Sequence, residues 1–167
     1  MRTVYLVRHG LSEANNRENI GTPAFGASNA ELMPEGIEHA KSAGNILVGR
    51  FALLQTTHTA TSTMLRTQQT AKEAGFVNFT EYAALDEVPV VLDECAAERR
   101  ARWRSGELDS HILNYAHETL CDAPPEQIWF THGLRIAGIC RVLEQYQDKR
   151  TIPYFGEVRA IELSSDD

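Results

Sequence analysis

A short apolar run near the start of the sequence, residues 3–7, leads directly into Arg8, His9 and Gly10. Its β-branched and aromatic residues and its lack of charge predict a buried strand, and the glycine would let the chain turn sharply after it. A cation at the carboxyl end of a buried strand is costly unless it meets an anion, and ligands of open α/β sheets bind at this edge. The pattern therefore predicts a phosphate site in which His9 is close enough to attack the phosphorus.

A second strand segment ends in the same way much later in the chain. The buried-type run 128–131 is followed by His132 and a glycine. Because the carboxyl ends of parallel strands lie on one edge of a sheet, we expect His9 and His132 to face one another. A third strand-to-helix junction places Arg66 in the first turn of a helix, where it should point back toward the same edge.

The elements that must position these residues alternate along the chain between strands and helices. This alternation predicts an α/β protein, a three-layer α/β/α sandwich with a mostly parallel central sheet, in one domain over residues 1–167. We expect Pro34 at a first helical position and Gly75 just after a helix end. Residues 83–106 have no readable pattern. The expected strands are about 3–8, 55–60, 77–82, 128–131 and, at an edge, 157–163, and the expected helices are near 34–47, 62–74, 108–120 and 136–143.

The composition restricts the class of protein. A net charge of −7 argues against nucleic-acid binding and makes any local group of arginines a candidate anion site. No apolar run is long enough to span a bilayer and no signal peptide is recognisable, so no membrane association is expected. The cysteines are odd in number and widely separated, which predicts reduced thiols and a cytoplasmic location.

Three motifs together resemble the histidine phosphatase superfamily, also called the phosphoglycerate mutase-like family. The resemblance extends over nearly the whole chain and points to the compact phosphatase branch, with a phosphoglycerate mutase-like fold. A leucine-to-glycine helix start, Leu32 to Gly36, is also similar to the family pattern. The three motifs are, in chain order, Arg8-His9-Gly10 with Ser12 and Asn15, Ser62 with Leu65 and Arg66, and Thr131-His132-Gly133.

The resemblance implies a metal-independent phosphatase that works through a phosphohistidine. His9 would attack through a neutral ring nitrogen, and the nearby Arg8 and Arg66 would disfavour its protonation. A backbone carbonyl such as that of Gly10 could fix the tautomer. Fixed cations would replace a metal ion, so neither a metal nor a cofactor is expected. The expected phosphate ligands are Arg8, Ser12, Asn15, Arg66, His132 and Gly133.

The leaving alcohol needs a proton, and in this family a carboxylate provides it. Glu87 stands about where the family carries that group, so we assign it as general acid/base. The glycine and tryptophan that usually follow the carboxylate are replaced here by residues 88–91. Asp86 and Glu94 are therefore kept as alternatives.

Several of these residues also have a simpler interpretation in which they serve the structure and not the chemistry. Ser12 could be only a helix cap and Asn15 only a turn residue. Zinc binding by the two histidines is disfavoured because adjacent arginines repel a cation. The basic run Arg99–Arg104 is most simply a solvated helix face, and the alternative is a lid that holds a second anionic group of the substrate.

Three functions follow from the sequence. The segment between Glu87 and His132 is short, whereas the family's mutases usually carry a longer insertion, so a phosphatase is favoured over a mutase. A non-catalytic phosphate-binding module of the same fold is the alternative from another class. The substrate would be a phosphorylated small molecule or a phosphorylated protein side chain, and the sequence predicts no oligomeric state.

Overall fold

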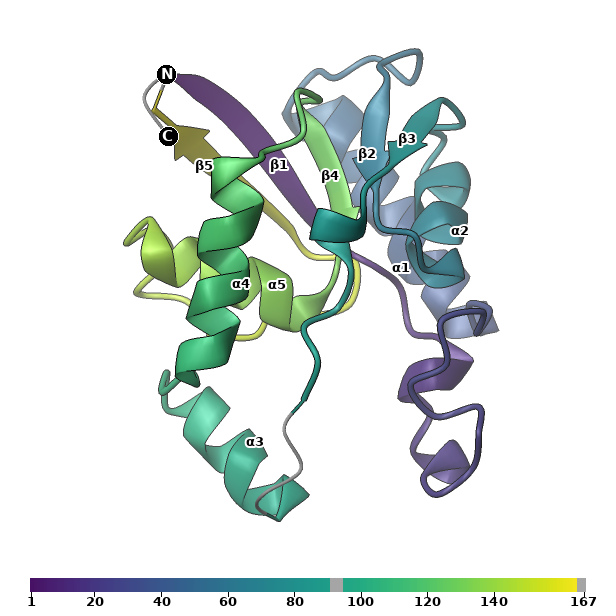
Figure 1. The fold of residues 1–167 in the computed structure, drawn as a ribbon. Helices are drawn as coiled ribbons and strands as arrows, with labels where there is room; N and C mark the ends of the chain where they lie inside the picture. Colours follow the sequence, from purple (N-terminus) through teal and green to yellow (C-terminus); the bar gives the residue numbers. More distant parts are fainter. Residues whose placement is uncertain (91–94, 165–167) are drawn as a thin grey trace.

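The computed structural model describes residues 1–90 and 95–164. Within these residues five strands form one sheet in the order β3-β2-β4-β1-β5 (Figure 1). Neighbouring strands run parallel except β5, which pairs antiparallel with β1 at the edge of the sheet. The predicted mostly parallel sheet is therefore confirmed. The strands are β1 (Arg2–Arg8), β2 (Thr59–Thr61), β3 (Phe79–Glu81), β4 (Ile128–Thr131) and β5 (Val158–Leu163).

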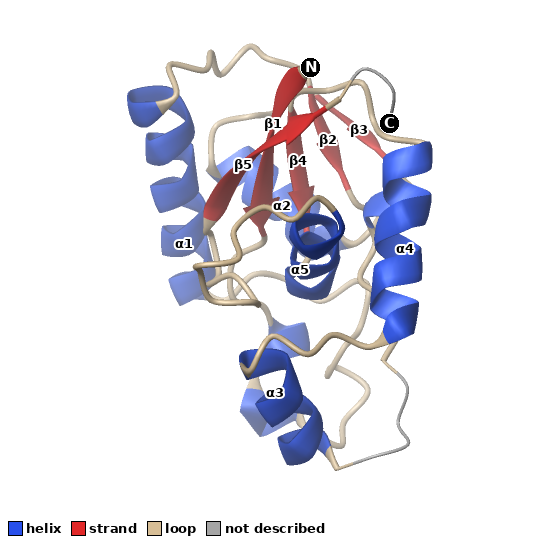
Figure 2. Ribbon diagram, turned by 90° about the vertical axis from the view of Figure 1, so that its left-hand side faces the viewer, coloured by secondary structure: helices blue, strands red, loops and turns tan. Residues whose placement is uncertain are grey.

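Helices cover both faces of this sheet, which gives the predicted three layers (Figure 2). Helices α1 and α2 lie on one face, α4 and α5 lie on the other, and α3 stands beyond the carboxyl ends of the strands. No helix in the described residues is long and apolar enough to cross a membrane. The helices are α1 (Pro34–Asn45), α2 (Leu65–Glu73), α3 (Ala96–Arg104), α4 (Ser110–Cys121) and α5 (Gly133–Val142), with short turns η1 (Glu13–Asn15), η2 (Arg17–Asn19), η3 (Ile46–Arg50) and η4 (Ala83–Leu85).

Alternate strand residues supply the two halves of the core. In β1, Leu6 packs with Trp129 of β4 against α4 and α5. The next residues along the same strands, Val7 and Phe130, pack against α1 and α2 on the opposite face. Because successive side chains of a strand point to opposite faces, a strand covered on both sides must be apolar throughout. This requirement explains the continuous apolar runs that end at the two histidines.

Two helix boundaries agree with the sequence patterns. Pro34 is the first residue of α1, and the preceding Met33 provides no side-chain cap. Gly75 directly follows the C-cap of α2 and has a φ of +95°, in the left-handed region. Glycine is favoured there because it has no Cβ to clash with the backbone.

Two expectations differ from the structure. The second strand covers only Thr59–Thr61 and begins later than the expected 55–60. Residues 52–58 form a loop, and only the three residues that follow it are fully buried in the sheet. The unreadable segment 83–106 contains α3, none of whose residues is buried. A helix without a buried face has no apolar periodicity, so the pattern predicts no bounds for α3, although the basic run Arg99–Arg104 is interpreted as a solvated helix face.

Gly10 and Gly36 allow two backbone segments to come unusually close. The sharp turn predicted at Gly10 is wrong. Gly10 does not have a positive φ, so backbone conformation does not explain why a glycine stands at this position. A Cβ at Gly10 would instead overlap the carbonyl of Gly36, and a Cβ at Gly36 would overlap the carbonyl of Leu11. The start of α1 therefore packs directly on the chain that leaves β1, and it supports the segment that carries His9.

Gly36→Ala is expected to destabilise the fold by about 1–3 kcal/mol, since the added methyl group must displace backbone rather than a flexible side chain. The free energy of unfolding in urea measures the effect. Gly49→Ala is the matched control, because a Cβ at Gly49 meets nothing within 4 Å. Equal stabilities of the two variants would contradict the close-packing argument.

Candidate active site

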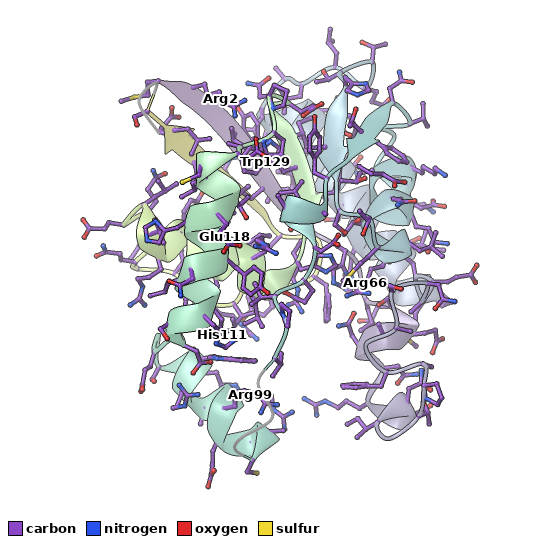
Figure 3. All side chains as sticks on the ribbon, in the orientation of Figure 1. Arg2, Arg66, Arg99, His111, Glu118 and Trp129 are labelled. Atoms are coloured by element: carbon purple, nitrogen blue, oxygen red, sulfur yellow. The ribbon has the colours of Figure 1, made fainter. Side chains whose placement is uncertain are left out.

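The two histidines and an arginine from three different elements meet at the carboxyl edge of the sheet. His9 follows β1 and His132 follows β4, and Arg66, which is labelled in Figure 3, lies in the first turn of α2. The ring centroids of His9 and His132 are 5.0 Å apart. Arg66 Nε lies 3.3 Å from His9 Nε2. All three side chains are almost fully buried, with 1% exposed for His9, 0% for His132 and 3% for Arg66.

The hydrogen bonds of His9 assign its tautomer. Nδ1 lies 2.6 Å from the carbonyl oxygen of Gly10, an acceptor, so Nδ1 carries the proton. Arg66 Nε donates toward Nε2, which must then carry the lone pair. The carbonyl contact expected from the sequence is therefore present. Together the two contacts leave His9 as a neutral imidazole whose basic nitrogen lies beside a guanidinium.

The surroundings of His9 favour this neutral form. Burial, followed by the charges of Arg66 and Arg8, lowers the pKa of His9 well below its usual value. The hydrogen bond to Gly10 opposes this shift without reversing it. The imidazole is therefore unprotonated at neutral pH and keeps the electron pair that a nucleophile needs.

His132 has one ring nitrogen engaged and one without a partner. Nε2 lies 2.9 Å from Ser62 Oγ, at the end of β2. Nδ1 is buried and has no hydrogen-bond partner among the described residues. When the hydroxyl of Ser62 donates to Nε2, Nδ1 carries the ring proton and can donate to a ligand. Burial and the neighbouring His9 and Arg66 lower the pKa of His132 well below its usual value.

Arg8 is held in place by contacts that leave its buried Nε unused. Its Nη1 donates to the carbonyl of Pro153 at 2.6 Å, and its guanidinium carbon lies 3.9 Å from the ring centroid of Phe155. Nε is buried without a partner in the described part of the chain, next to Gly133. Burial lowers the pKa of Arg8 to about 10, so the group stays cationic at neutral pH.

These buried donors without acceptors indicate an anion site. Buried polar atoms in proteins are hydrogen-bonded in the great majority of cases, and exceptions commonly mark a ligand position. Arg8 Nε and His132 Nδ1 both belong to residues that flank His9 in space. Gly133 is the first residue of α5, so its backbone N–H belongs to the helix end that favours negative charge.

Ser12 and Asn15 interact with each other at the rim of this site. Ser12 Oγ donates to Asn15 Oδ1 at 2.7 Å, and Ser12 does not cap η1 through its side chain. The bond uses the amide oxygen of Asn15, so the amide nitrogen is the group that Asn15 can offer to an anion. Asn15 lines the cleft described below, whereas Ser12 is fully buried behind it.

The carboxylates near the site have different surroundings. Glu87 lines the cleft together with Arg8, and burial raises its pKa, although the backbone N–H of Val88 and nearby arginines oppose the shift. Asp86 instead accepts hydrogen bonds from the backbone N–H and hydroxyl of Thr63, at 2.8 and 2.9 Å. Glu94 lies outside the described residues. Of the two described carboxylates, Glu87 lines the cleft and has a raised pKa, whereas the carboxylate of Asp86 is bound by Thr63.

Arg135 is a residue that the sequence did not single out. It is 3% exposed, and its Nε and Nη2 donate to the carbonyl of Asp86 at 2.9 and 2.7 Å. Its Nη1 donates to the carbonyl of Tyr115 at 2.9 Å, so the side chain joins α4 and α5 to the loop that carries Glu87. Arg135 therefore positions the candidate acid/base. In the sequence Ser62 is only part of a motif, and its contact with His132 adds it to the site.

A cleft with two lobes that share lining residues adjoins the site through Arg8, Asn15, Glu87 and Gly133, whereas His9, Arg66 and His132 line neither lobe. One lobe, about 380 Å³, is lined by Glu87, Arg99, Gly133 and apolar side chains, and the other, about 320 Å³, is lined by Arg17, Arg104, Arg150 and Phe155. Both are also lined by Arg8, Asn15, Phe25, Arg100, Trp103 and Ile152. In the described residues, no group of three or more His, Cys, Asp or Glu side chains could hold a metal ion.

Comparison with known proteins agrees with this geometry. The model of the histidine phosphatase superfamily (branch 1) matches residues 4–102, so the chain belongs to that superfamily. No protein with a curated description matches the chain.

Several solved structures share the fold at low sequence identity. A mutant phosphoserine phosphatase of Entamoeba histolytica in complex with phosphoserine has a TM-score of 0.66 and 18% identity, over 99% of this chain and 92% of that chain. Phosphoserine phosphatase of the same organism with 3-phosphoglyceric acid gives a TM-score of 0.63 and 20% identity, over 96% and 90%. TTHB049 from Thermus thermophilus gives 0.64 and 18%, over 96% and 93%. The predicted phosphoglycerate mutase-like α/β fold is thereby confirmed.

Proposed function

We propose that this protein is a phosphatase that hydrolyses phosphomonoesters through a phosphohistidine on His9. The observation that carries the proposal is the pair of hydrogen bonds on the His9 ring, which keeps Nδ1 protonated and Nε2 basic. In the first step a bond forms between Nε2 and phosphorus while the bond from phosphorus to the ester oxygen breaks. In the second step water attacks the phosphorus and releases inorganic phosphate and free His9.

The phosphoryl oxygens would be held by charged and neutral donors already fixed in place. Arg8 Nε and His132 Nδ1 are the buried donors that need an acceptor, and Arg66 lies against the nucleophile. The amide nitrogen of Asn15 adds a neutral donor, and the Gly133 N–H adds the end of α5. Each preorganised donor of this kind typically contributes about 3 kcal/mol to transition-state stabilisation. In this proposal Ser12 orients Asn15 and does not contact the phosphate itself.

Glu87 would move the protons. Its raised pKa favours the protonated form that can donate to the leaving alkoxide. The carboxylate formed in that step then accepts a proton from the attacking water and returns to its starting state. Arg135 keeps the loop in position through the Asp86 carbonyl. Such a mechanism uses only side chains of this protein and requires no metal or cofactor.

A phosphatase is favoured over a mutase because the chain between Glu87 and His132 forms α3, α4 and β4 without a long insertion that would enclose the substrate. Phosphorylated small molecules are favoured as substrates over phosphoproteins, because the two Entamoeba histolytica complexes hold phosphoserine and 3-phosphoglyceric acid.

Hydrolysis of 4-nitrophenyl phosphate and of phosphoserine, with and without EDTA, tests the proposal. We expect equal rates with and without the chelator, release of inorganic phosphate, and a phosphoenzyme that survives an alkaline denaturing quench and is lost on acid treatment. Transfer of the phosphoryl group to an added alcohol in preference to water would indicate a mutase. Binding of inorganic phosphate without turnover of any ester would indicate a non-catalytic module.

A further inference from the structure

The second lobe of the cleft has a chemistry that the reacting phosphate does not use. Arg17 comes from η2, Arg104 from α3, and Arg150 from the segment before β5. Figure 1 shows α3 and the segment that contains η1 and η2 facing each other beyond the carboxyl ends of the strands. Arginines from three parts of the chain therefore line one cavity next to the candidate active site, in a protein with a net charge of −7.

These arginines are not neutralised by the described part of the protein. Within residues 1–90 and 95–164, no carboxylate forms an ion pair with Arg17, Arg104 or Arg150, and no described carboxylate lines this lobe. Arg102, on the same helix as Arg104, pairs instead with Asp109 at 2.7 Å. The basic run thus has a paired side and a side that lines the cleft, so it is more than the solvated face favoured by the sequence.

The side chains shared by the two lobes include an apolar and aromatic group beside Arg8, Asn15 and Arg100. Phe25, Trp103 and Ile152 line both of them, and the lobe with Glu87 also includes Ile20 and Leu134. Volumes of about 380 and 320 Å³ fall in the range of clefts that take ligands of many heavy atoms, roughly 300–1,000 Å³. A three-carbon phosphate would leave most of this space, and the apolar surface between the lobes, without contact.

We propose that the substrate is a phosphomonoester with a flat apolar body and a second anionic group, which Arg17, Arg104 and Arg150 bind in the second lobe. This inference rests on the proposed function for the position of the reacting phosphate. The apolar body lies against Trp103 and Phe25 between the two anions. Arg150 is partly preorganised, since its Nε donates to the carbonyl of Ile152 at 2.9 Å.

Paired substrates of equal shape test the proposal. The probes are 4-carboxyphenyl phosphate and its neutral isostere 4-carbamoylphenyl phosphate, with 1,4-phenylene bisphosphate as a second dianionic probe and phosphoserine as a small one. We expect kcat/KM of the wild type to be about fivefold or more higher for the 4-carboxy ester or the bisphosphate than for the neutral ester. Two exposed ion pairs are sufficient to produce a preference of this size. The preference should appear in KM, because a distal contact is equal in the ground and transition states.

Arg17→Ala combined with Arg104→Ala should remove that preference, since both side chains are exposed and neither makes a hydrogen bond in the described residues. The control, Lys41→Ala combined with Arg50→Ala, removes the same charge outside the cleft and should keep it. Equal kcat/KM for the charged and neutral esters, or a preference for phosphoserine over all aromatic esters, would overturn the inference while the proposed function stands.

Absence of turnover on every ester would count against the proposed function instead. The subsite would then be measured directly by calorimetric titration of the same esters. Tighter binding of the 4-carboxy ester that is lost in the double arginine variant would support it, and equal binding of the charged and neutral esters would overturn it.

Discussion

His9→Ala is expected to reduce phosphatase turnover by about 10⁴-fold or more, while the variant still binds inorganic phosphate. The neutral ring of His9 supplies the attacking electron pair but no positive charge, because burial and the adjacent arginines lower its pKa. Its removal deletes the nucleophile and leaves Arg8 and Arg66 in place. Turnover of 4-nitrophenyl phosphate and calorimetric titration with phosphate measure the two quantities separately.

The role of His9 is distinguished from that of the other histidines by comparison. His58→Ala is the control, because His58 is exposed and its Nε2 lies 2.8 Å from Thr80 Oγ1 and 3.9 Å from Glu126 Oε1, neither of which lines the cleft. His132→Ala should lose about 10²–10³-fold, the effect of one preorganised donor. A phosphoenzyme that still forms in His9→Ala, or a larger loss in His132→Ala than in His9→Ala, would reverse the proposed assignment.

The convergence of the site could be predicted because it depends on topology rather than on fine geometry. His9 and His132 each follow a strand with a continuous apolar run, and parallel pairing of β1 with β4 places both strand ends on one edge. Arg66 follows the neighbouring strand β2 by a few residues, so its position in the first turn of α2 was also readable.

Contacts made by residues with no pattern of their own could not be predicted. Arg135 lies in a helix that is buried along most of its length, and its partner Asp86 is 49 positions away in the sequence. The same holds for the pair Ser12 and Asn15, where local spacing predicted two phosphate ligands and the structure shows a bond between them. Such hydrogen bonds depend on side-chain orientation, which spacing alone does not determine.

The cleft was the part of the candidate site that was hardest to predict from the sequence. Helix α3, which lines it, has no buried residue and therefore no periodic apolar pattern. The sequence identified the basic run Arg99–Arg104 but could not separate its faces. Only packing shows that Arg102 pairs with Asp109 while Arg100 and Arg104, one helical turn apart, line the cleft. The contribution of Arg17 and Arg150 had no sequence signal.

Glu87→Gln is expected to affect substrates according to their leaving groups. An alkoxide such as that of phosphoserine needs a proton to leave, so kcat/KM for phosphoserine should fall by about 10²–10⁴-fold. The 4-nitrophenolate anion is stable and leaves without a proton, so kcat/KM for its ester should change by less than about tenfold. Both values are obtained from initial rates on the same enzyme preparation.

The second step gives an independent readout of the same variant. Without the carboxylate, water is not activated, so kcat for 4-nitrophenyl phosphate should fall and the phosphoenzyme on His9 should accumulate. A rapid alkaline quench, in which phosphohistidine is stable, should therefore trap more of it in Glu87→Gln than in the wild type. Unchanged phosphoenzyme levels together with equal losses for both esters would assign the proton transfer to another group.

Activity on phosphoserine is expected to fall as the pH rises. The protonated carboxyl is the active form for leaving-group departure, so activity on phosphoserine is retained below the pKa of Glu87 and lost as the pH rises through it. Because burial raises this pKa, the loss should occur at a higher pH than for an ordinary glutamate, and it should be absent in Glu87→Gln.

Asp86→Asn is the matched control, since that carboxylate accepts hydrogen bonds from Thr63. Its losses should be similar for both esters, and a leaving-group dependence in Asp86→Asn would transfer the acid/base role to Asp86.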